Sequence, residues 1–164
     1  MHGDIVSNVR ENLHYLDVSI FNHILSGRMI MYKMMLSDLD ETLLIGQHVP
    51  VFNQEAIREA KKHGLRFVVA TGRSHRMIGD ILKEIGTYDM PGEYSICFNG
   101  GLVVENKDFK ILHFQGLDYE LLKKCFDYGC KENLCMLVFT LDCCYIYNPD
   151  AVSYTHLRAH ETRH

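Results

Sequence analysis

Short apolar runs alternate with amphipathic stretches through the middle of the chain. The runs at 32–37, 66–70 and 94–98 are apolar almost throughout and predict buried strands. The stretches between them carry apolar residues at the three- and four-residue spacing of helices. Strands that are apolar on both faces and alternate with helices are typical of a parallel sheet covered on both sides. The pattern predicts an α/β fold, in which residues 31–114 form the N-terminal half of a doubly wound, Rossmann-like core.

Polar residues and glycines mark the ends of the two predicted helices. Asn53 and Ser74 can each accept a hydrogen bond from the first turn of a helix, and Gly64 and Gly86 can end it. We therefore expect one helix that begins at Asn53 and stops just before Gly64. A second helix is expected to begin at Ser74 and stop just before Gly86.

The pattern changes after Gly101. The elements expected there are a hairpin of 102–105 with 110–114, a helix capped by Asp118, and a pair of strands at 135–140 and 144–147. This mixture is typical of an α+β unit rather than of a continued parallel sheet. We therefore place a domain change near Gln115 and interpret residues 115–151 as the beginning of a cap domain.

An amphipathic stripe precedes the predicted core. Apolar residues recur at helical spacing from residue 5 to residue 25, followed by Gly27. We interpret residues 1–30 as an N-terminal extension whose helix packs on its own domain, or as sequence translated ahead of the true start. The alternative is a docking helix, which makes the chain a non-enzymatic binding or interaction module.

The segment 152–164 resembles an in-frame translation of a transposase adapter used in sequencing libraries. His156, His160 and His164 in this segment are four residues apart, a helical spacing that otherwise indicates a metal site. We interpret this spacing as accidental and place the segment outside the fold. On this interpretation the gene is cut short at about residue 151.

Composition and charge exclude several classes of protein. Hydrophobic residues make up 47% and charged residues 23% of the 164 residues, which is ordinary for a globular protein and unlike a disordered one. A net charge of -4 indicates no nucleic-acid or anionic-membrane partner. The N-terminus lacks the basic and apolar pattern of a secretory signal, so we expect a cytoplasmic protein whose six cysteines are reduced and mostly buried.

Two carboxylates follow the first predicted strand. Asp38 and Asp40 are two residues apart and can point into one crevice at the carboxyl end of the strand, where ligands bind in α/β sheets. A divalent cation relieves the repulsion between them, and hard oxygen ligands suit Mg²⁺. We therefore predict that Asp38 and Asp40 hold Mg²⁺.

The second and third strands also end in polar residues. Arg73, His75 and Arg76 lie where the next helix is expected to begin, a place that disfavours cations unless an anion such as phosphate lies beside them. Gly72 lets the backbone approach a ligand closely, and the Thr71 hydroxyl can donate to a phosphate oxygen. The pattern indicates a phosphate site at the same edge of the sheet as the two carboxylates.

Taken together, these segments resemble the haloacid dehalogenase superfamily and its Cof-type, sugar-phosphatase-like branch. The stretch LSDLDETLL at 36–44 is similar to the first motif of that family, Asp-x-Asp-x-Thr. VVATGRS at 68–74 looks like its second motif, and ICFNGG at 96–101 is similar to the segment that leads into the cap. The resemblance covers roughly residues 31–150.

The resemblance implies a Mg²⁺-dependent phosphatase that acts on small phosphorylated metabolites such as sugar phosphates. Asp38 is then expected to be the nucleophile that forms an aspartyl-phosphate, and Asp40 the general acid and base. The implied metal ligands are the Asp38 carboxylate and the Asp40 backbone carbonyl. The implied phosphate- or substrate-binding residues are Thr42, Thr71, Gly72, Arg73, Asn99 and Gly100.

In that family a lysine motif and an acidic motif follow the cap. We expect neither in this chain, and therefore expect the chain alone to be inactive. A glycosyltransferase is the alternative enzyme class, because its Asp-x-Asp also holds a metal. It predicts neither Thr42 nor the Thr-Gly-Arg at 71–73, so it accounts for less of the sequence.

The adapter interpretation predicts that the tail binds no Zn²⁺ specifically. Replacing His156, His160 and His164 together by alanine is expected to leave Zn²⁺ binding by the purified chain unchanged in isothermal titration. A defined Zn²⁺ affinity that disappears in the triple variant would show that the histidine spacing is functional.

Overall fold

The computed structural model describes residues 32–149 of the chain. The predicted N-terminal extension at 1–30, with its stripe from 5 to 25, and the predicted tail at 152–164 lie outside the described residues. The chain divides into two compact units, the first ending at His113 and the second beginning at Phe114. No helix within residues 32–149 is long and apolar enough to cross a membrane.

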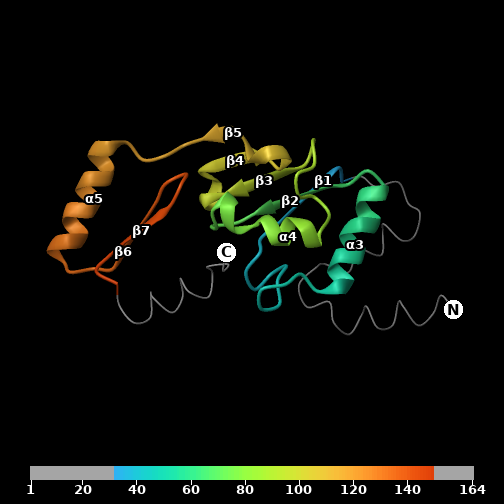
Figure 1. The fold of residues 1–164 in the computed structure, drawn as a ribbon, viewed down its shortest axis with the longest axis horizontal. Coiled ribbons are helices and arrows are strands. Elements are labelled where there is room, and N and C mark those ends of the chain that lie inside the picture. Colours follow the sequence, from blue (N-terminus) through green and yellow to red (C-terminus); the bar gives the residue numbers. More distant parts are fainter. Residues whose placement is uncertain (1–31, 150–164) are drawn as a thin grey trace. The chain divides into compact units, whose positions relative to one another are not determined.

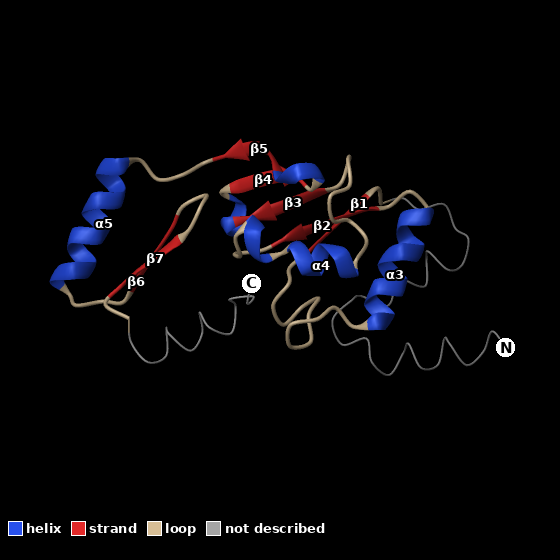
Figure 2. Ribbon diagram, viewed as in Figure 1, coloured by secondary structure: helices blue, strands red, loops and turns tan. Residues whose placement is uncertain are grey.

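The first unit is built on one five-stranded sheet (Figures 1 and 2). Its elements are β1 (Met34–Ser37), α3 (Val51–Lys62), β2 (Arg66–Ala70), the 3-10 turn η1 (His75–Met77), α4 (Gly79–Glu84), β3 (Tyr94–Cys97), the turn η2 (Phe98–Gly100), β4 (Leu102–Glu105), the turn η3 (Lys107–Phe109) and β5 (Lys110–Phe114). The strands lie side by side in the order β1-β2-β3-β4-β5. β1, β2 and β3 are parallel, whereas β4 is antiparallel to β3. The sheet is therefore mixed. Its first three strands are parallel and form the Rossmann-like α/β core that the sequence predicts.

The strand β2 is the interior of this sheet. Phe67, Val68 and Val69 are all buried, although successive side chains of a strand point to opposite faces. Both faces of the sheet are therefore covered at β2. The sequence prediction of a strand at 66–70 is confirmed to the residue.

The strand β1 is shorter and more exposed than the sequence predicts. It begins at Met34 rather than at Tyr32, and Met34 and Leu36 are half exposed. Met35, on the opposite face, packs against the buried pair Ala60 and Leu65. β1 is an edge strand of the described sheet, so one of its faces is open and the expectation of full burial is wrong.

The helix boundaries also differ from the predicted ones. Asn53 is not a cap but lies buried within the first turn of α3, where its Nδ2 is 3.5 Å from the carbonyl oxygen of Leu43. Ser74 does act as a cap, because its Oγ accepts from the backbone N–H of Arg76 at 3.3 Å. It caps the turn η1 instead of a long helix, because the backbone of Ile78 (φ -106°, ψ -1°) departs from helical values before α4 begins.

The antiparallel side of the sheet is fixed by a buried amide. Asn106, in the turn after β4, is 1% exposed. Its Oδ1 accepts from the Ser95 hydroxyl at 2.8 Å, and its Nδ2 donates to the carbonyl oxygen of Thr87 at 3.1 Å. A buried amide with both ends bonded specifies one arrangement of its neighbours. Asn106, just after the end of β4, therefore connects β3 to the loop that precedes β3.

The described part of the second unit, residues 114–149, contains one helix and one hairpin: α5 (Tyr119–Lys131), β6 (Met136–Phe139) and β7 (Cys144–Tyr147). Asp118 caps α5 as predicted, since its Oδ1 accepts from the backbone N–H of Leu121 at 2.8 Å. β6 and β7 pair antiparallel, also as predicted. The ring of Phe126 on α5 lies edge-on to that of Tyr147, with centroids 5.2 Å apart.

The prediction that the cysteines are mostly buried is wrong. All six are free thiols, but Cys97 is the one that is buried, and Cys125 and Cys143 are exposed. The others, Cys130, Cys135 and Cys144, lie half-buried in the second unit.

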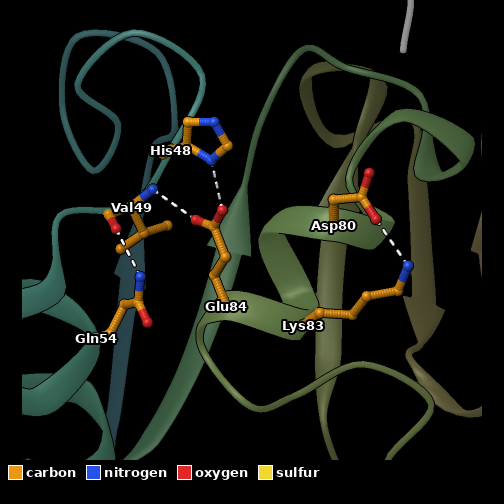
Figure 3. A network of polar contacts seen from close by, with 6 residues as sticks. All are labelled: His48, Val49, Gln54, Asp80, Lys83 and Glu84. Carbon is orange, nitrogen blue, oxygen red and sulfur yellow. Dashed lines mark hydrogen bonds and ion pairs between the residues drawn. The ribbon is translucent and has the colours of Figure 1, made fainter. Parts of the chain in front are cut away.

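A carboxylate at the end of α4 holds the loop that leads into α3 (Figure 3). Glu84 accepts from the backbone N–H of Val49 and from His48 Nδ1, both at 2.7 Å. Gln54 Nε2 donates to the carbonyl oxygen of Val49 at 2.8 Å, so both backbone groups of Val49 are bonded. Val49 itself is 2% exposed. Glu84 thus connects the segment that follows the first predicted motif to α4.

Replacing Glu84 by alanine is expected to destabilise the first unit, because the N–H of Val49 loses its charged acceptor. The free energy of unfolding should fall by about 1–3 kcal/mol, measured by urea denaturation. Asp80→Ala is the matched control on the same helix. Asp80 pairs with Lys83 in an exposed contact at 2.7 Å (Figure 3), which contributes little in water. Equal losses in the two variants would contradict the role given to Glu84.

Candidate active site

The candidate site lies where three parallel strands end. The register places Ser37 beside Val69 and Val69 beside Ser95, so the three strands β1, β2 and β3 are aligned along their length. Their carboxyl ends therefore meet at one edge of the sheet, the usual place for ligands in α/β folds. The residues that follow the strands begin at Asp38, Thr71 and Phe98.

The turn after β1 alternates exposed and buried side chains. Asp38 is exposed and Asp40 is partly exposed, whereas Leu39 between them is fully buried. The Leu39 carbonyl oxygen accepts from the backbone N–H groups of Leu43 at 3.0 Å and Leu44 at 2.9 Å. Both of these leucines are buried as well. The apolar residues anchor the turn from inside, so that the two carboxylates are presented at the sheet edge.

Thr42 belongs to the same turn. Its backbone N–H donates to the carbonyl oxygen of Leu39 at 3.3 Å, and its side chain is partly exposed. The structure therefore places Thr42 beside the carboxylates through its backbone. A hydroxyl role toward phosphate stays a prediction.

The loops after β2 and β3 are bonded to each other. The Thr71 carbonyl oxygen accepts from the N–H of Asn99, and the Arg73 carbonyl oxygen accepts from the N–H of Phe98, both at 3.1 Å. The Thr71 hydroxyl accepts from the N–H of Arg73 at 3.2 Å, which leaves its own hydrogen for another acceptor. Thr71 is 5% exposed. The two loops form one structure in which the positions of Thr71 and Asn99 depend on each other.

The loop after β3 has an uncommon backbone. Phe98 (φ 51°), Asn99 (φ 53°) and Gly100 (φ 98°) all have positive φ. Glycine adopts this region freely and asparagine tolerates it, but a phenylalanine there is strained. The sequence Asn-Gly indicates a turn, whereas nothing in the sequence predicts the strain at Phe98.

Asn99 packs directly against Gly72. A Cβ added to Gly72 would lie 3.0 Å from the Asn99 Oδ1 atom. The absence of a side chain at Gly72 therefore lets the Asn99 carboxamide approach the Thr71–Arg73 loop. The neighbour of Gly72 is thus Asn99, and the close approach of a ligand to Gly72 stays a prediction.

Arg73 forms a two-point ion pair with Asp40. Its Nε donates to Asp40 Oδ2 at 3.0 Å, and its Nη2 to Asp40 Oδ1 at 2.5 Å. The side chain of Arg73 is 8% exposed and that of Asp40 is 45% exposed. Guanidinium–carboxylate pairs of this geometry are directional and strong. The pair joins the first predicted motif to the second.

Two residues next to the site have a supporting role, and one of them, His75, is a residue that the sequence counts among the cations beside a phosphate. The ring of His75 is buried and lies edge-on to those of Phe98 and Phe109, with centroids 6.5 and 5.7 Å apart. Cys97 ends β3 with 0% exposure, and burial raises the pKa of its thiol to about 12. A thiol in that state is a packing group rather than a nucleophile.

The oxygen atoms at this edge fit part of a Mg²⁺ site. The exposed Asp38 carboxylate is a hard, anionic ligand of the kind that Mg²⁺ prefers, and Mg²⁺ keeps several waters beside one or two protein carboxylates. Within residues 32–149 no three His, Cys, Asp or Glu side chains gather as a metal site. A Mg²⁺ ion at this edge would therefore take only some of its ligands from residues 32–149.

Comparison with known proteins gives the family. The model of the haloacid dehalogenase-like hydrolases matches residues 35–164. In Bacillus subtilis (strain 168), the protein YxeH is 28% identical over 134 residues, which are 81% of this chain and 49% of YxeH. Phosphatase YwpJ of the same organism is 30% identical over 109 residues, covering 66% of this chain and 36% of YwpJ. The chain thus spans about half the length, or less, of these relatives.

Solved structures agree with the fold. A haloacid dehalogenase-like hydrolase from B. subtilis superposes with a TM-score of 0.65 at 25% identity, over 76% of this chain and 42% of that one. The haloacid dehalogenase subclass IIB sugar phosphatase BT4131 superposes with a TM-score of 0.67, over 78% of this chain and 48% of that one. Its identity of 19% supports the fold alone. Since the family model covers most of the chain and the sheet edge carries the expected motifs, the protein belongs to the haloacid dehalogenase-like hydrolase family.

Proposed function

We propose that the chain carries the nucleophile and the acid–base group of a Mg²⁺-dependent phosphatase for small phosphorylated metabolites such as sugar phosphates. The observation that carries the proposal is the arrangement at the sheet edge, where Asp38 is exposed and Asp40 is oriented by Arg73. YwpJ, a relative at 30% identity, is named a phosphatase, which supports the same reaction class. The sugar-phosphate substrate rests on the resemblance to the Cof-type branch.

In the first step, an oxygen of the Asp38 carboxylate attacks phosphorus. A bond from Asp38 to phosphorus forms as the bond from phosphorus to the leaving oxygen breaks, which gives an aspartyl-phosphate. Asp40 delivers a proton to the leaving oxygen, so that the product departs as an alcohol. Exposure of Asp38 is required for this attack, because a buried carboxylate could not reach the substrate.

In the second step, Asp40 removes a proton from water. The resulting hydroxide attacks phosphorus, the bond to Asp38 breaks, and inorganic phosphate leaves. The Thr71 hydroxyl donates to a phosphoryl oxygen. The Asn99 carboxamide, which lies against Gly72, is the second group that we assign to the substrate. Gly100 leaves the backbone after β3 open to the ligand, and Gly72 makes room for the Asn99 carboxamide. Thr42 helps to hold the turn that carries the carboxylates.

The Asp38 carboxylate and the backbone carbonyl of Asp40 are the groups that we assign to Mg²⁺. When bound, Mg²⁺ offsets the negative charge of the phosphoryl oxygens and of Asp38. Since residues 32–149 bring no third acidic ligand to the site, its affinity is expected to depend on substrate oxygens. A cytoplasmic location fits this use of a metabolite substrate.

Asp38→Asn is expected to abolish phosphate release, because the amide keeps the shape of the side chain but is no nucleophile. The loss should be roughly 10³-fold or more in kcat, and Asp40→Asn should lower kcat roughly 10²- to 10⁴-fold. The assay measures inorganic phosphate released from a set of sugar phosphates, with and without Mg²⁺. It is run on the 164-residue chain and on a fusion that continues residues 1–149 with the part of YxeH beyond the matched segment.

The matched control is Asp108→Asn. Asp108 is an exposed aspartate of the same unit with a positive φ, which asparagine tolerates. Its activity should equal that of the unchanged protein. A folded fusion that binds Mg²⁺ yet hydrolyses none of the esters, or an Asp38→Asn variant with full turnover, would contradict the proposed function.

A further inference from the structure

We infer that Arg73 is a positioning residue for Asp40 rather than a ligand of the substrate phosphate. This inference rests on the proposed function, because it concerns the group that we assign as general acid and base. The geometry that carries it is the two-point contact, in which the Nε and Nη2 atoms of Arg73 each reach one oxygen of Asp40. A carboxylate bonded through both oxygens cannot rotate without breaking a bond.

The exposed fractions of the two side chains indicate which of them faces the substrate. Arg73 is 8% exposed, whereas Asp40 is 45% exposed. A ligand of the substrate has to present its charge to the open side of the site, and here Asp40 occupies that side. Arg73 lies behind it and acts on the substrate through it.

The backbone of Arg73 is fixed on both sides. Its N–H donates to the Thr71 hydroxyl at 3.2 Å, and its carbonyl oxygen accepts from the N–H of Phe98 at 3.1 Å. A long flexible side chain therefore starts from a rigid point. Asp40 lies in the turn after β1, where the next residue, Glu41, is exposed and has a φ of 57°. The rigid loop after β2 thus sets the orientation of the side chain after β1.

The ion pair leaves Asp40 able to react. Each carboxylate oxygen has two lone pairs, and an N–H group of Arg73 uses one of them on each oxygen. Arg73 does not use the second lone pair of either oxygen, and protonation of a carboxylate requires one lone pair. Arg73 therefore orients the acid–base group without blocking it, in the way that a well-placed donor holds a catalytic side chain in one rotamer.

A spectroscopic test uses the full chain and requires no activity. In a sample labelled with ¹⁵N arginine, the Nε–H signal of Arg73 is assigned through its own backbone. Asp40→Asn is expected to shift this signal and to speed its exchange with water roughly tenfold or more, because a charged acceptor is lost. Asp108→Asn should leave it unchanged. A signal that is identical in the Asp40→Asn variant would overturn the inference.

A kinetic test separates positioning from phosphate binding in the fusion protein described above. Arg73→Lys keeps the charge but loses the two-point geometry, so kcat should fall roughly 10- to 100-fold while KM stays within about twofold. In an Asp40→Asn background the same substitution should lower kcat no further, because the two residues act as a unit. Arg66→Lys is the control, since Arg66 lies over the ring of Tyr94 and outside the site.

The alternative, in which Arg73 is a ligand of the substrate phosphate, predicts different kinetics for the Arg73→Lys variant. If Arg73 binds the substrate phosphate, Arg73→Lys raises KM with kcat nearly unchanged, and its effect adds to that of Asp40→Asn. Either result overturns the inference while leaving the phosphatase proposal intact. Conversely, a protein that hydrolyses no phosphate ester contradicts the proposed function, and the arginine signal still decides whether Arg73 holds Asp40.

Discussion

The parallel pairing of β1, β2 and β3 is the constraint on which the rest of the site depends. Parallel strands that run level with one another must end at the same edge, so whatever follows each strand is brought together there. Behind that edge lie Phe67, Val68 and Val69, which are almost entirely buried. Burying a charged group in such a core has a large free-energy cost. The polar residues of the three loops are therefore held at the edge, where they can meet one another and a ligand.

Two kinds of contact turn that edge into an ordered site. Leu39, Leu43 and Leu44 anchor the turn after β1 by burial, which fixes the backbone but leaves the carboxylates exposed. The loops after β2 and β3 are fixed instead by hydrogen bonds between their backbones. The ion pair between Arg73 and Asp40 joins these two halves through side chains. Loss of that pair should thus disturb the site more than the fold.

The sequence predicts the order of elements well because apolar runs and helical spacing reflect burial directly. The strand at 66–70 is predicted to the residue, since it is interior and buried on both faces. β1 is predicted too long and too buried, because the sequence does not reveal that it lies at an edge of the described sheet. Asn53 is mistaken for a cap because a buried asparagine in a first helical turn has the same local sequence as a capping one. For the site, the motifs locate Asp38, Asp40 and Thr71 at one edge, but pairing between residues 33 positions apart leaves no local signal.

The ion pair also changes how the charges of the site are understood. Cations beside a predicted helix start indicate an anionic ligand when nothing else neutralises them. Here Asp40 neutralises Arg73, so that cation is no longer evidence for phosphate by itself. Asp38 and a phosphate ester then confront each other with like charge, and their approach is unfavourable without a counter-charge. Backbone N–H groups and the Thr71 hydroxyl supply only partial charges. The pairing of Arg73 therefore leaves more of this counter-charge to another cation than the sequence implies, which supports the proposal of a divalent ion such as Mg²⁺ at the site.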